Sequence, residues 1–166
     1  PAIQDADLVV LSDYAKGALP LSLLAKIIAH AKAKGKMIIA DPKRADISVY
    51  SGVDLLTPNL AELQNTTAQS LRSIETISKA ATAHAKDFGI GSILTTMSAR
   101  GMMLSKADGT QFHDPASARD IFDVSGAGDT VVAMVAGALV AGADLEDAVR
   151  LANHAAGVAV GKSGTA

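Results

Sequence analysis

Short, nearly continuous apolar runs alternate along this chain with longer stretches whose apolar residues recur at helical spacing. The short runs predict buried strands at residues 7–12, 36–41, 53–57 and 91–96, with residues 101–104 as a hairpin partner of the last. The longer stretches predict helices at residues 19–34, 70–88, 125–141 and 145–160. Strands that are apolar on both sides and alternate with helices are typical of a parallel sheet covered on both faces. We therefore expect an α/β fold with a mostly parallel sheet.

Composition limits the classes of partner. Hydrophobic residues make up 49% of the 166 residues and aromatic residues only 3%, so we expect a core of small and branched aliphatic side chains. The formal net charge is -2, and no basic run is interleaved with aromatic residues, so a nucleic-acid partner is not expected. Because the chain has no cysteine, disulfides, thiolate metal sites and cysteine nucleophiles are excluded.

The sequence also predicts no association with membranes. Its most apolar stretch, residues 131–142, is too short to span a bilayer. The first five residues have neither the basic start nor the apolar core of a signal peptide. We therefore expect a cytoplasmic protein.

Four of the expected strands end in polar or turn-forming residues. These ends are Ser12-Asp13, Asp41-Pro42-Lys43, Thr57-Pro58-Asn59 and Thr95-Thr96. In open parallel sheets, ligands bind outside the carboxyl ends of the strands. The functional site is therefore predicted at this edge of the sheet.

The segment Asp123-Val124-Ser125-Gly126-Ala127-Gly128-Asp129-Thr130 opens a predicted helix. A helix start carries unpaired amides and partial positive charge, and the glycines would let a phosphate approach the backbone. Asp129 fits such an anion site only if its carboxylate faces a hydroxyl and takes the proton during attack. A phosphate cradle beside a base is what phosphoryl transfer requires.

Glycine-rich segments of this kind also allow other interpretations. Residues 123–130 could equally be an ordinary capped helix start with glycines for tight packing. The segment also loosely resembles a dinucleotide fingerprint, an alternative that stays open although Val131 stands where a third glycine or alanine belongs. The segment Gly161-Lys162-Ser163 resembles the end of a P-loop, but Ala156 replaces the required glycine and the segment follows a helix, so a P-loop is rejected.

Asn59 and Glu62 lie three residues apart at a predicted helix start, where they offer an amide and a carboxylate to one point. This pair suits a hydrated Mg²⁺ or its phosphates, because magnesium keeps several waters and takes few protein ligands. The alternative is a helix N-cap with a partial capping box.

Charged residues gather at two of the strand ends. Asp13, Lys16, Lys43 and Arg44 could hold a phosphorylated or hydroxyl-rich substrate, and a solvated sheet edge is the alternative, especially for Arg44. The histidines have no metal-ligand spacing, so no metal-histidine or Ser-His-Asp site is predicted from them.

In this order, these segments resemble the ribokinase-like (PfkB) family of sugar kinases, and within it the heptose 7-phosphate kinases. The resemblance rests on residues 123–130 and on further segments, which are Leu11 to Leu19, Asp41-Pro42-Lys43, Leu55 to Leu60 and Ala152 to Thr165. It implies a three-layer ribokinase-like fold that uses ATP and Mg²⁺. The implied reaction phosphorylates heptose 7-phosphate at its anomeric hydroxyl to give the 1,7-bisphosphate, a step of ADP-heptose and lipopolysaccharide core biosynthesis.

The resemblance also implies a role for particular residues. Asp129 would be the catalytic base, and the amides of Gly126, Ala127 and Gly128 would form the anion hole. Asn59, Leu60, Ala61 and Glu62 would serve Mg-ATP, while Asp123 and Ser125 would bind a monovalent cation such as K⁺. Thr96, Ser98 and Gly101 would border the nucleotide, with Asn153 and Gly157 near the adenine.

The chain departs from this family in length, which is roughly half of what the family shows. Residues 1–166 are therefore expected to be the C-terminal part of one kinase domain, lacking the N-terminal half and its β lid, with weak or no activity alone. The full-length protein is expected to be a homodimer. Arg44 stands where the subfamily has a small residue. Open alternatives are a kinase for ribose, fructose 1-phosphate or a nucleoside, and a non-catalytic nucleotide-binding module.

Overall fold

The computed structural model describes residues 2–116 and 127–160, and within them the strands form one sheet in the order β1 to β6. The strands are β1 (Leu8–Asp13), β2 (Met37–Pro42), β3 (Leu55–Leu56), β4 (Ser92–Thr96), β5 (Met102–Lys106) and β6 (Gln111–Asp114). Neighbours from β1 to β4 are parallel, whereas β5 and β6 are added antiparallel. The mostly parallel sheet and the hairpin partner of β4 are thus as predicted.

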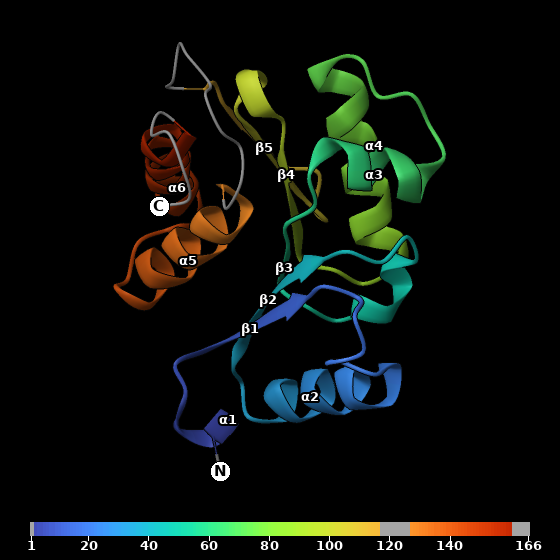
Figure 1. Cartoon of the computed structure of the whole chain (residues 1–166), viewed down its shortest axis with the longest axis vertical. Coiled ribbons are helices and arrows are strands. Elements are labelled where there is room, and N and C mark those ends of the chain that lie inside the picture. The colour runs from blue at the N-terminus through green and yellow to red at the C-terminus, as the bar shows by residue number, and fades with distance from the viewer. Residues whose placement is uncertain (1, 117–126, 161–166) are drawn as a thin grey trace.

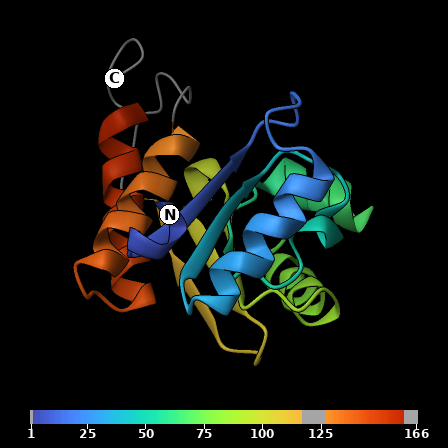
Figure 2. The same cartoon turned by 90° about the horizontal axis from the view of Figure 1, so that it is seen from below.

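Helices cover both faces of this sheet (Figures 1 and 2). The α-helices are α1 (Ala2–Asp5), α2 (Leu21–Ala33), α3 (Leu60–Thr67), α4 (Ile74–Asp87), α5 (Ala127–Val140) and α6 (Leu145–Val160), and the 3₁₀ helices are η1 (Ile47–Tyr50) and η2 (Ser98–Arg100). The pair α5 and α6 lies on one face, and α2, α3 and α4 lie on the other. No helix in the described ranges is long and apolar enough to cross a membrane.

Successive side chains of the strands enter opposite cores, as the period of two in a strand requires. Ile38 packs in the core that contains Leu24 of α2 and Ile77 of α4. Its neighbour Ile39 packs in the core that contains Val131 and Val135 of α5. This arrangement explains why the strand sequences are apolar without alternation.

The start of α4 and the extent of β3 differ from the sequence prediction. The helix expected at residues 70–88 begins at Ile74, because Ser73 caps it: the Ser73 side chain accepts from the Thr76 amide. Leu71 is buried, but it lies outside the helix. The strand expected at residues 53–57 is assigned only at Leu55–Leu56, although Asp54 and Thr57 still donate backbone hydrogen bonds to β2.

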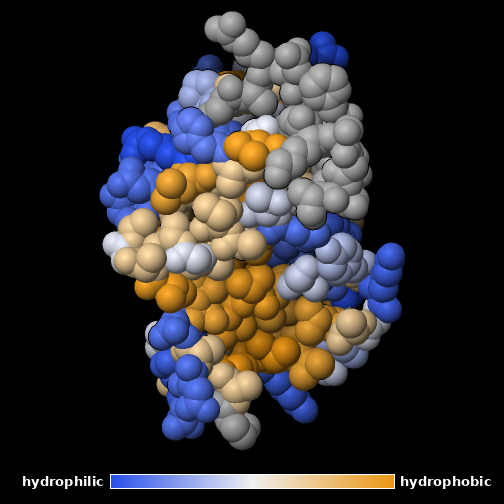
Figure 3. All heavy atoms as spheres, turned by 60° about the vertical axis from the view of Figure 1, so that its left-hand side comes forward, coloured by the Kyte–Doolittle hydropathy of each residue, from blue (hydrophilic) through white to orange (hydrophobic). Residues whose placement is uncertain are grey.

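β1 lies at the end of the sheet, and the structure pairs it with β2. Val10 of β1 is 43% exposed, and Met134 and Val140 of α5 are also among the exposed large hydrophobic residues. Figure 3 shows a broad apolar area on the side of the molecule where β1 and α5 lie. Within the described residues, β1 is therefore an edge strand of the sheet, next to an exposed apolar surface.

Candidate active site

The polar strand ends lie together at one edge of the sheet, as predicted. In the register of β1 and β2, Ser12 is opposite Asp41. Beyond β3 and β4, Asn59 and Thr96 form a further parallel bridge. The residues that follow separate strands in the sequence therefore surround a common space.

That space contains a cavity of about 620 Å³, a volume typical of ligand-binding pockets. The cavity brings together most residues that were predicted to serve the nucleotide, which are Asn59, Leu60, Ala61, Glu62, Thr96, Ser98, Ala127, Gly128, Asn153 and Gly157. Lys43 and Asp41 line it as well. Lys43, predicted to bind the acceptor, thus lies on the same side as the predicted nucleotide residues.

Asn59 and Glu62 form a complete capping box at the start of α3. The Asn59 side chain accepts from the Glu62 amide at 2.9 Å, and the Glu62 carboxylate accepts from the Asn59 amide at 2.8 Å. Such reciprocal bonds satisfy two amides that a helix start leaves unpaired. The capping role predicted as an alternative is confirmed, and it fixes both side chains at the rim of the cavity.

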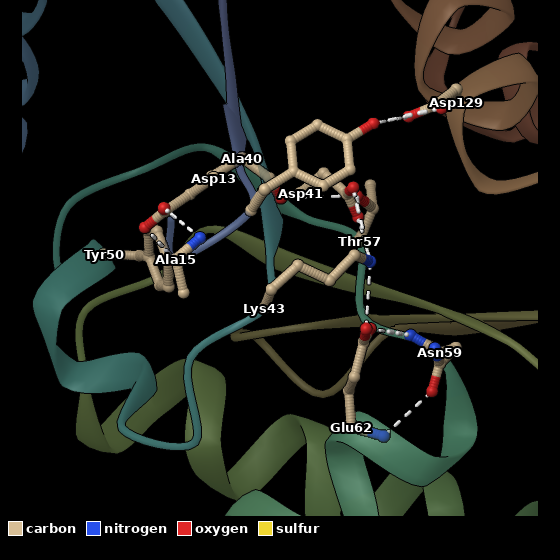
Figure 4. Close-up of polar contacts among 11 residues, drawn as sticks. Asp13, Ala15, Ala40, Asp41, Lys43, Tyr50, Thr57, Asn59, Glu62 and Asp129 are labelled. Atoms are coloured by element: carbon tan, nitrogen blue, oxygen red, sulfur yellow. Dashed lines mark hydrogen bonds and ion pairs between the residues drawn. The ribbon is translucent and has the colours of Figure 1, made fainter. Parts of the chain in front are cut away.

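Lys43 lies between Glu62 and Asp41 (Figure 4). Its Nζ is 2.9 Å from Glu62 Oε1 and 3.4 Å from the Asp41 carboxylate. Burial raises the pKa of Asp41 above its usual value; Lys43 opposes this shift, while Glu62 and Asp129 add to it. Burial opposes the charge on Lys43, yet Glu62 and Asp41 outweigh this and raise its pKa. The rim thus holds two carboxylates around one ammonium group.

Asp129 lines a second, smaller cavity of about 280 Å³. Val10 and Ser12 of β1, Val132 and Ala133 of α5, and Asp41 complete its lining. Asp41 lines both cavities, and Ala127 and Gly128, just before Asp129 in α5, line the larger one. The first turn of α5 therefore separates two cavities and presents its carboxylate to the smaller one.

Tyr14 contacts the predicted base, although it was not among the predicted site residues. The Tyr14 hydroxyl donates to the Asp129 carboxylate, at 3.0 Å from Oδ1 and 3.1 Å from Oδ2. Figure 4 draws this hydrogen bond as the dashed line that reaches Asp129. Tyr14 follows the end of β1, so its position at the predicted edge was the available signal. Its partner lies 115 residues away, and nothing in the sequence connects them.

Asp13 is buried and engaged by the protein itself. Its carboxylate accepts from Arg44, from the Tyr50 hydroxyl at 2.8 Å and from the Ala15 amide at 2.9 Å. Burial opposes its ionisation, but these donors prevail and hold the pKa of Asp13 below its usual value. Arg44, for which a solvated edge was favoured, is partly exposed and pairs with this buried carboxylate. Lys16 is exposed in the loop after β1, so the structure does not gather the four charged residues into one group.

Asn153 and Gly101 organise the segment at the far side of the larger cavity. The Asn153 side chain donates to Asp114 Oδ2 at 2.6 Å and to the Pro115 carbonyl at 2.7 Å. A Cβ on Gly101 would lie 2.0 Å from the Asp114 carbonyl oxygen, so only glycine fits there. Gly101 thus borders this segment and supports the wall of the cavity.

Part of the predicted site lies outside the described residues, namely Asp123, Ser125 and Gly126. Within residues 2–116 and 127–160, no group of three or more acidic or histidine side chains is placed to hold a metal ion. A metal ion bound near these described residues would therefore need further ligands, such as water molecules or the phosphates of a nucleotide.

The fold has a three-layer α/β architecture, with two adjoining cavities at the carboxyl ends of the parallel strands. The model of the pfkB family carbohydrate kinases matches residues 1–166, and the chain belongs to this family. Its fold is the ribokinase-like fold predicted from the sequence.

Relatives agree with this assignment. The chain is 49% identical over 161 residues to the bifunctional protein HldE of Paramagnetospirillum magneticum, covering 97% of the chain and 33% of that protein. It is also 49% identical over 166 residues to HldE of Halorhodospira halophila, covering 100% of the chain and 34% of that protein. The chain thus spans about a third of the length of these curated relatives.

Solved structures show the same fold. Arabidopsis thaliana ribokinase, solved with ribose and ATP, superposes with a TM-score of 0.86 at 26% identity, over 98% of this chain and 52% of that one. Phosphofructokinase-2 from Escherichia coli, solved with potassium, gives a TM-score of 0.83 at 21% identity, over 96% and 53%. The second similarity concerns the fold alone.

Proposed function

We propose that this chain carries the nucleotide and catalytic side of an enzyme that transfers the γ-phosphoryl group of ATP to a hydroxyl of a sugar phosphate. One observation carries the proposal: the first turn of α5 contributes Ala127 and Gly128 to the larger cavity and Asp129 to the smaller one. ATP in the larger cavity and the acceptor in the smaller one would meet at this turn.

In this arrangement Asp129 is the general base. Its carboxylate accepts the proton of the acceptor hydroxyl while the hydroxyl oxygen attacks the γ-phosphorus and ADP leaves. The amides of Ala127 and Gly128, in the first turn of α5, would stabilise the charge on the transferring group. The proposed anion hole also includes Gly126, which lies outside the described residues. Lys43 lies in the larger cavity, so it faces the phosphates of ATP rather than the acceptor.

The residues at the cavity rim fit a hydrated magnesium ion. Asn59 Oδ1 and Glu62 Oε2 are engaged in the capping box, while Glu62 Oε1 accepts from the ammonium of Lys43. Asn59 and Glu62 would therefore contact the ion through its waters, as magnesium commonly allows. When bound with ATP, the ion neutralises charge on the phosphates. For K⁺, Asp123 and Ser125 remain the proposed ligands.

The proposed acceptor is heptose 7-phosphate, phosphorylated at its anomeric hydroxyl in ADP-heptose and lipopolysaccharide core biosynthesis. The resemblance to heptose 7-phosphate kinases and the identity of up to 49% to HldE proteins support this choice. We further propose that residues 1–166 are part of one kinase domain in a cytoplasmic, homodimeric protein. A ribose or nucleoside acceptor is the alternative.

The test uses the intact protein that contains these residues, with Asp129→Asn. Phosphoryl transfer to heptose 7-phosphate should fall by about 10²–10⁴-fold, the contribution of a general base, while calorimetric ATP binding persists. Asp147→Asn is the matched control, because Asp147 is an exposed carboxylate on α6 that pairs with Arg150. Undiminished transfer by Asp129→Asn would refute the role of the base. ATP binding without transfer to heptose 7-phosphate, ribose or fructose 1-phosphate by the wild type would favour a non-catalytic module.

A further inference from the structure

The contact between Tyr14 and Asp129 has the chemistry of a bound acceptor. The phenol donates one O–H to the carboxylate and lies nearly equidistant from its oxygens, at 3.0 and 3.1 Å. An acceptor hydroxyl must make the same O–H to carboxylate hydrogen bond before the base can take its proton. Tyr14 thus offers Asp129 the type of donor that the reaction needs from the sugar.

The loop that carries Tyr14 is fastened at both ends. Before Tyr14, the buried Asp13 is held by Arg44, Tyr50 and the Ala15 amide. At the other end, Arg44 Nη2 donates to the Leu19 carbonyl at 2.8 Å. One guanidinium therefore ties together the two ends of the connection between β1 and α2. The backbone at Tyr14 is consequently held in place, while its side chain, 51% exposed, is free of the core.

We propose that the Tyr14 hydroxyl is a placeholder for the acceptor: it occupies the hydrogen-bonding position at Asp129 until a sugar hydroxyl displaces it. The inference rests on the proposed function of Asp129 as the base. Tyr14 is a positioning residue in this account, because it acts on the carboxylate and not on the phosphoryl group.

The hydrogen bond from Tyr14 to Asp129 also affects whether water can replace the sugar as the phosphoryl acceptor. If Asp129 is open when ATP is bound, a water molecule can give its proton to the carboxylate, attack the γ-phosphorus and release ADP and phosphate. With the phenol on Asp129, a water molecule must first compete for the carboxylate. A polyhydroxylated acceptor held by further contacts in its cavity displaces the phenol more readily than water does. Tyr14 therefore favours sugar over water as acceptor.

The decisive variant is Tyr14→Phe, which keeps the ring and removes the donor. In the intact protein, ATP hydrolysis without acceptor should rise about two- to tenfold, and the KM for heptose 7-phosphate should fall by a similar factor, the range expected from one net hydrogen bond. The kcat for sugar phosphorylation should change little, because the base remains. Calorimetric binding of the acceptor without ATP should tighten in parallel.

Tyr50→Phe is the matched control, since it removes a phenol that donates to a different carboxylate, Asp13. Because Arg44 and the Ala15 amide still hold Asp13, the loop stays fastened, and the variant should lower the melting temperature without raising acceptor-free hydrolysis. If Tyr14→Phe leaves hydrolysis, KM and acceptor binding unchanged, or weakens acceptor binding, the placeholder role is refuted. That result is distinct from failure of the proposed function, which would show as full transfer by Asp129→Asn.

Discussion

The guanidinium of Arg44 lies against the buried carboxylate of Asp13, with Nε 2.5 Å from Oδ2. Asp13 is only 2% exposed, whereas Arg44 reaches solvent. A carboxylate at a strand end would be a natural substrate ligand, but this one is already engaged by donors from the protein. Its contribution to function is therefore indirect: it holds the loop that presents Tyr14 to Asp129.

This relationship predicts a loss of stability in Asp13→Asn. The amide cannot accept from Arg44, Tyr50 and the Ala15 amide as a carboxylate does, and hydrogen bonds to charged groups contribute about 1.5–3 kcal/mol. We expect the free energy of unfolding at pH 7 to fall by about that amount, measured by urea denaturation. Asp46→Asn, at an exposed 3₁₀-helix cap, should cost less.

The pH dependence of this loss follows from the lowered pKa of Asp13. Its stabilisation is fully present above the pKa of an unfolded aspartate, about 3.9, and is lost as pH falls through the lower pKa of the folded state. The difference between wild type and Asp13→Asn should therefore be constant near neutral pH and shrink below about pH 4. A difference that grows on acidification would contradict the assignment.

For Asp41, the expected pH dependence of stability has the opposite sign. Because burial raises its pKa, its ionisation costs stability: the favourable contribution is present below the unfolded pKa and is lost as pH rises through the folded pKa. Asp41→Asn should then unfold at an equal or higher urea concentration than wild type at pH 7. It should nevertheless impair phosphoryl transfer, because Asp41 lines both cavities. A clear loss of stability at pH 7 would contradict this account.

The position of the site could be predicted because each parallel strand carries its own signal. Polar residues such as Asp41 and Thr57 follow apolar runs, and the carboxyl ends of parallel strands share one edge. The capping residues Asn59 and Glu62 act within three residues, so local sequence suffices to find them. What could not be predicted is which side chains meet across the edge.

Charge pairing shows this limit. Lys43 and Arg44 are adjacent in sequence, yet Lys43 turns to Asp41 and Glu62 while Arg44 turns to Asp13. Sequence could group them by type, but only the path of the backbone after β2 separates them.

The start of α4 could not be predicted for a local reason. Ser73 forms its capping box with Thr76, whereas the usual sequence signature of a capping box has glutamate or glutamine at that position. Leu71, which is buried, also continues the apolar pattern before the helix begins.

Glu62→Gln separates the capping role of Glu62 from its charge. Glutamine retains an oxygen that can accept from the Asn59 amide, so the melting temperature should change little. The negative charge beside Lys43 and the proposed hydrated ion is lost, so the magnesium concentration for half-maximal activity should rise several-fold. Ser73→Ala removes a cap on α4, outside the residues that line the larger cavity, and should cost about 1 kcal/mol without altering the magnesium requirement. Equal magnesium requirements for wild type and Glu62→Gln would refute this role.

Gly101→Ala tests whether the turn beside the larger cavity depends on a glycine. Gly101 has φ 81° and ψ -137°, a conformation that side chains rarely adopt, and its Cβ would meet the Asp114 carbonyl oxygen at 2.0 Å. The strained backbone alone should lower the free energy of unfolding by about 1–3 kcal/mol, and the clash should add to this. Since Ser98 and Thr96 line the cavity just before this turn, ATP binding measured by calorimetry should weaken as well.

The control for this substitution is Gly109→Ala. Gly109 also has a positive φ, 96°, but no atom lies within 4 Å of its added Cβ. This variant should therefore show backbone strain without the clash, and it should bind ATP like the wild type because its turn lies between β5 and β6, away from the residues that line the cavity. If both variants lose the same stability and bind ATP equally well, the close approach of the Asp114 carbonyl to Gly101 does not support the cavity wall.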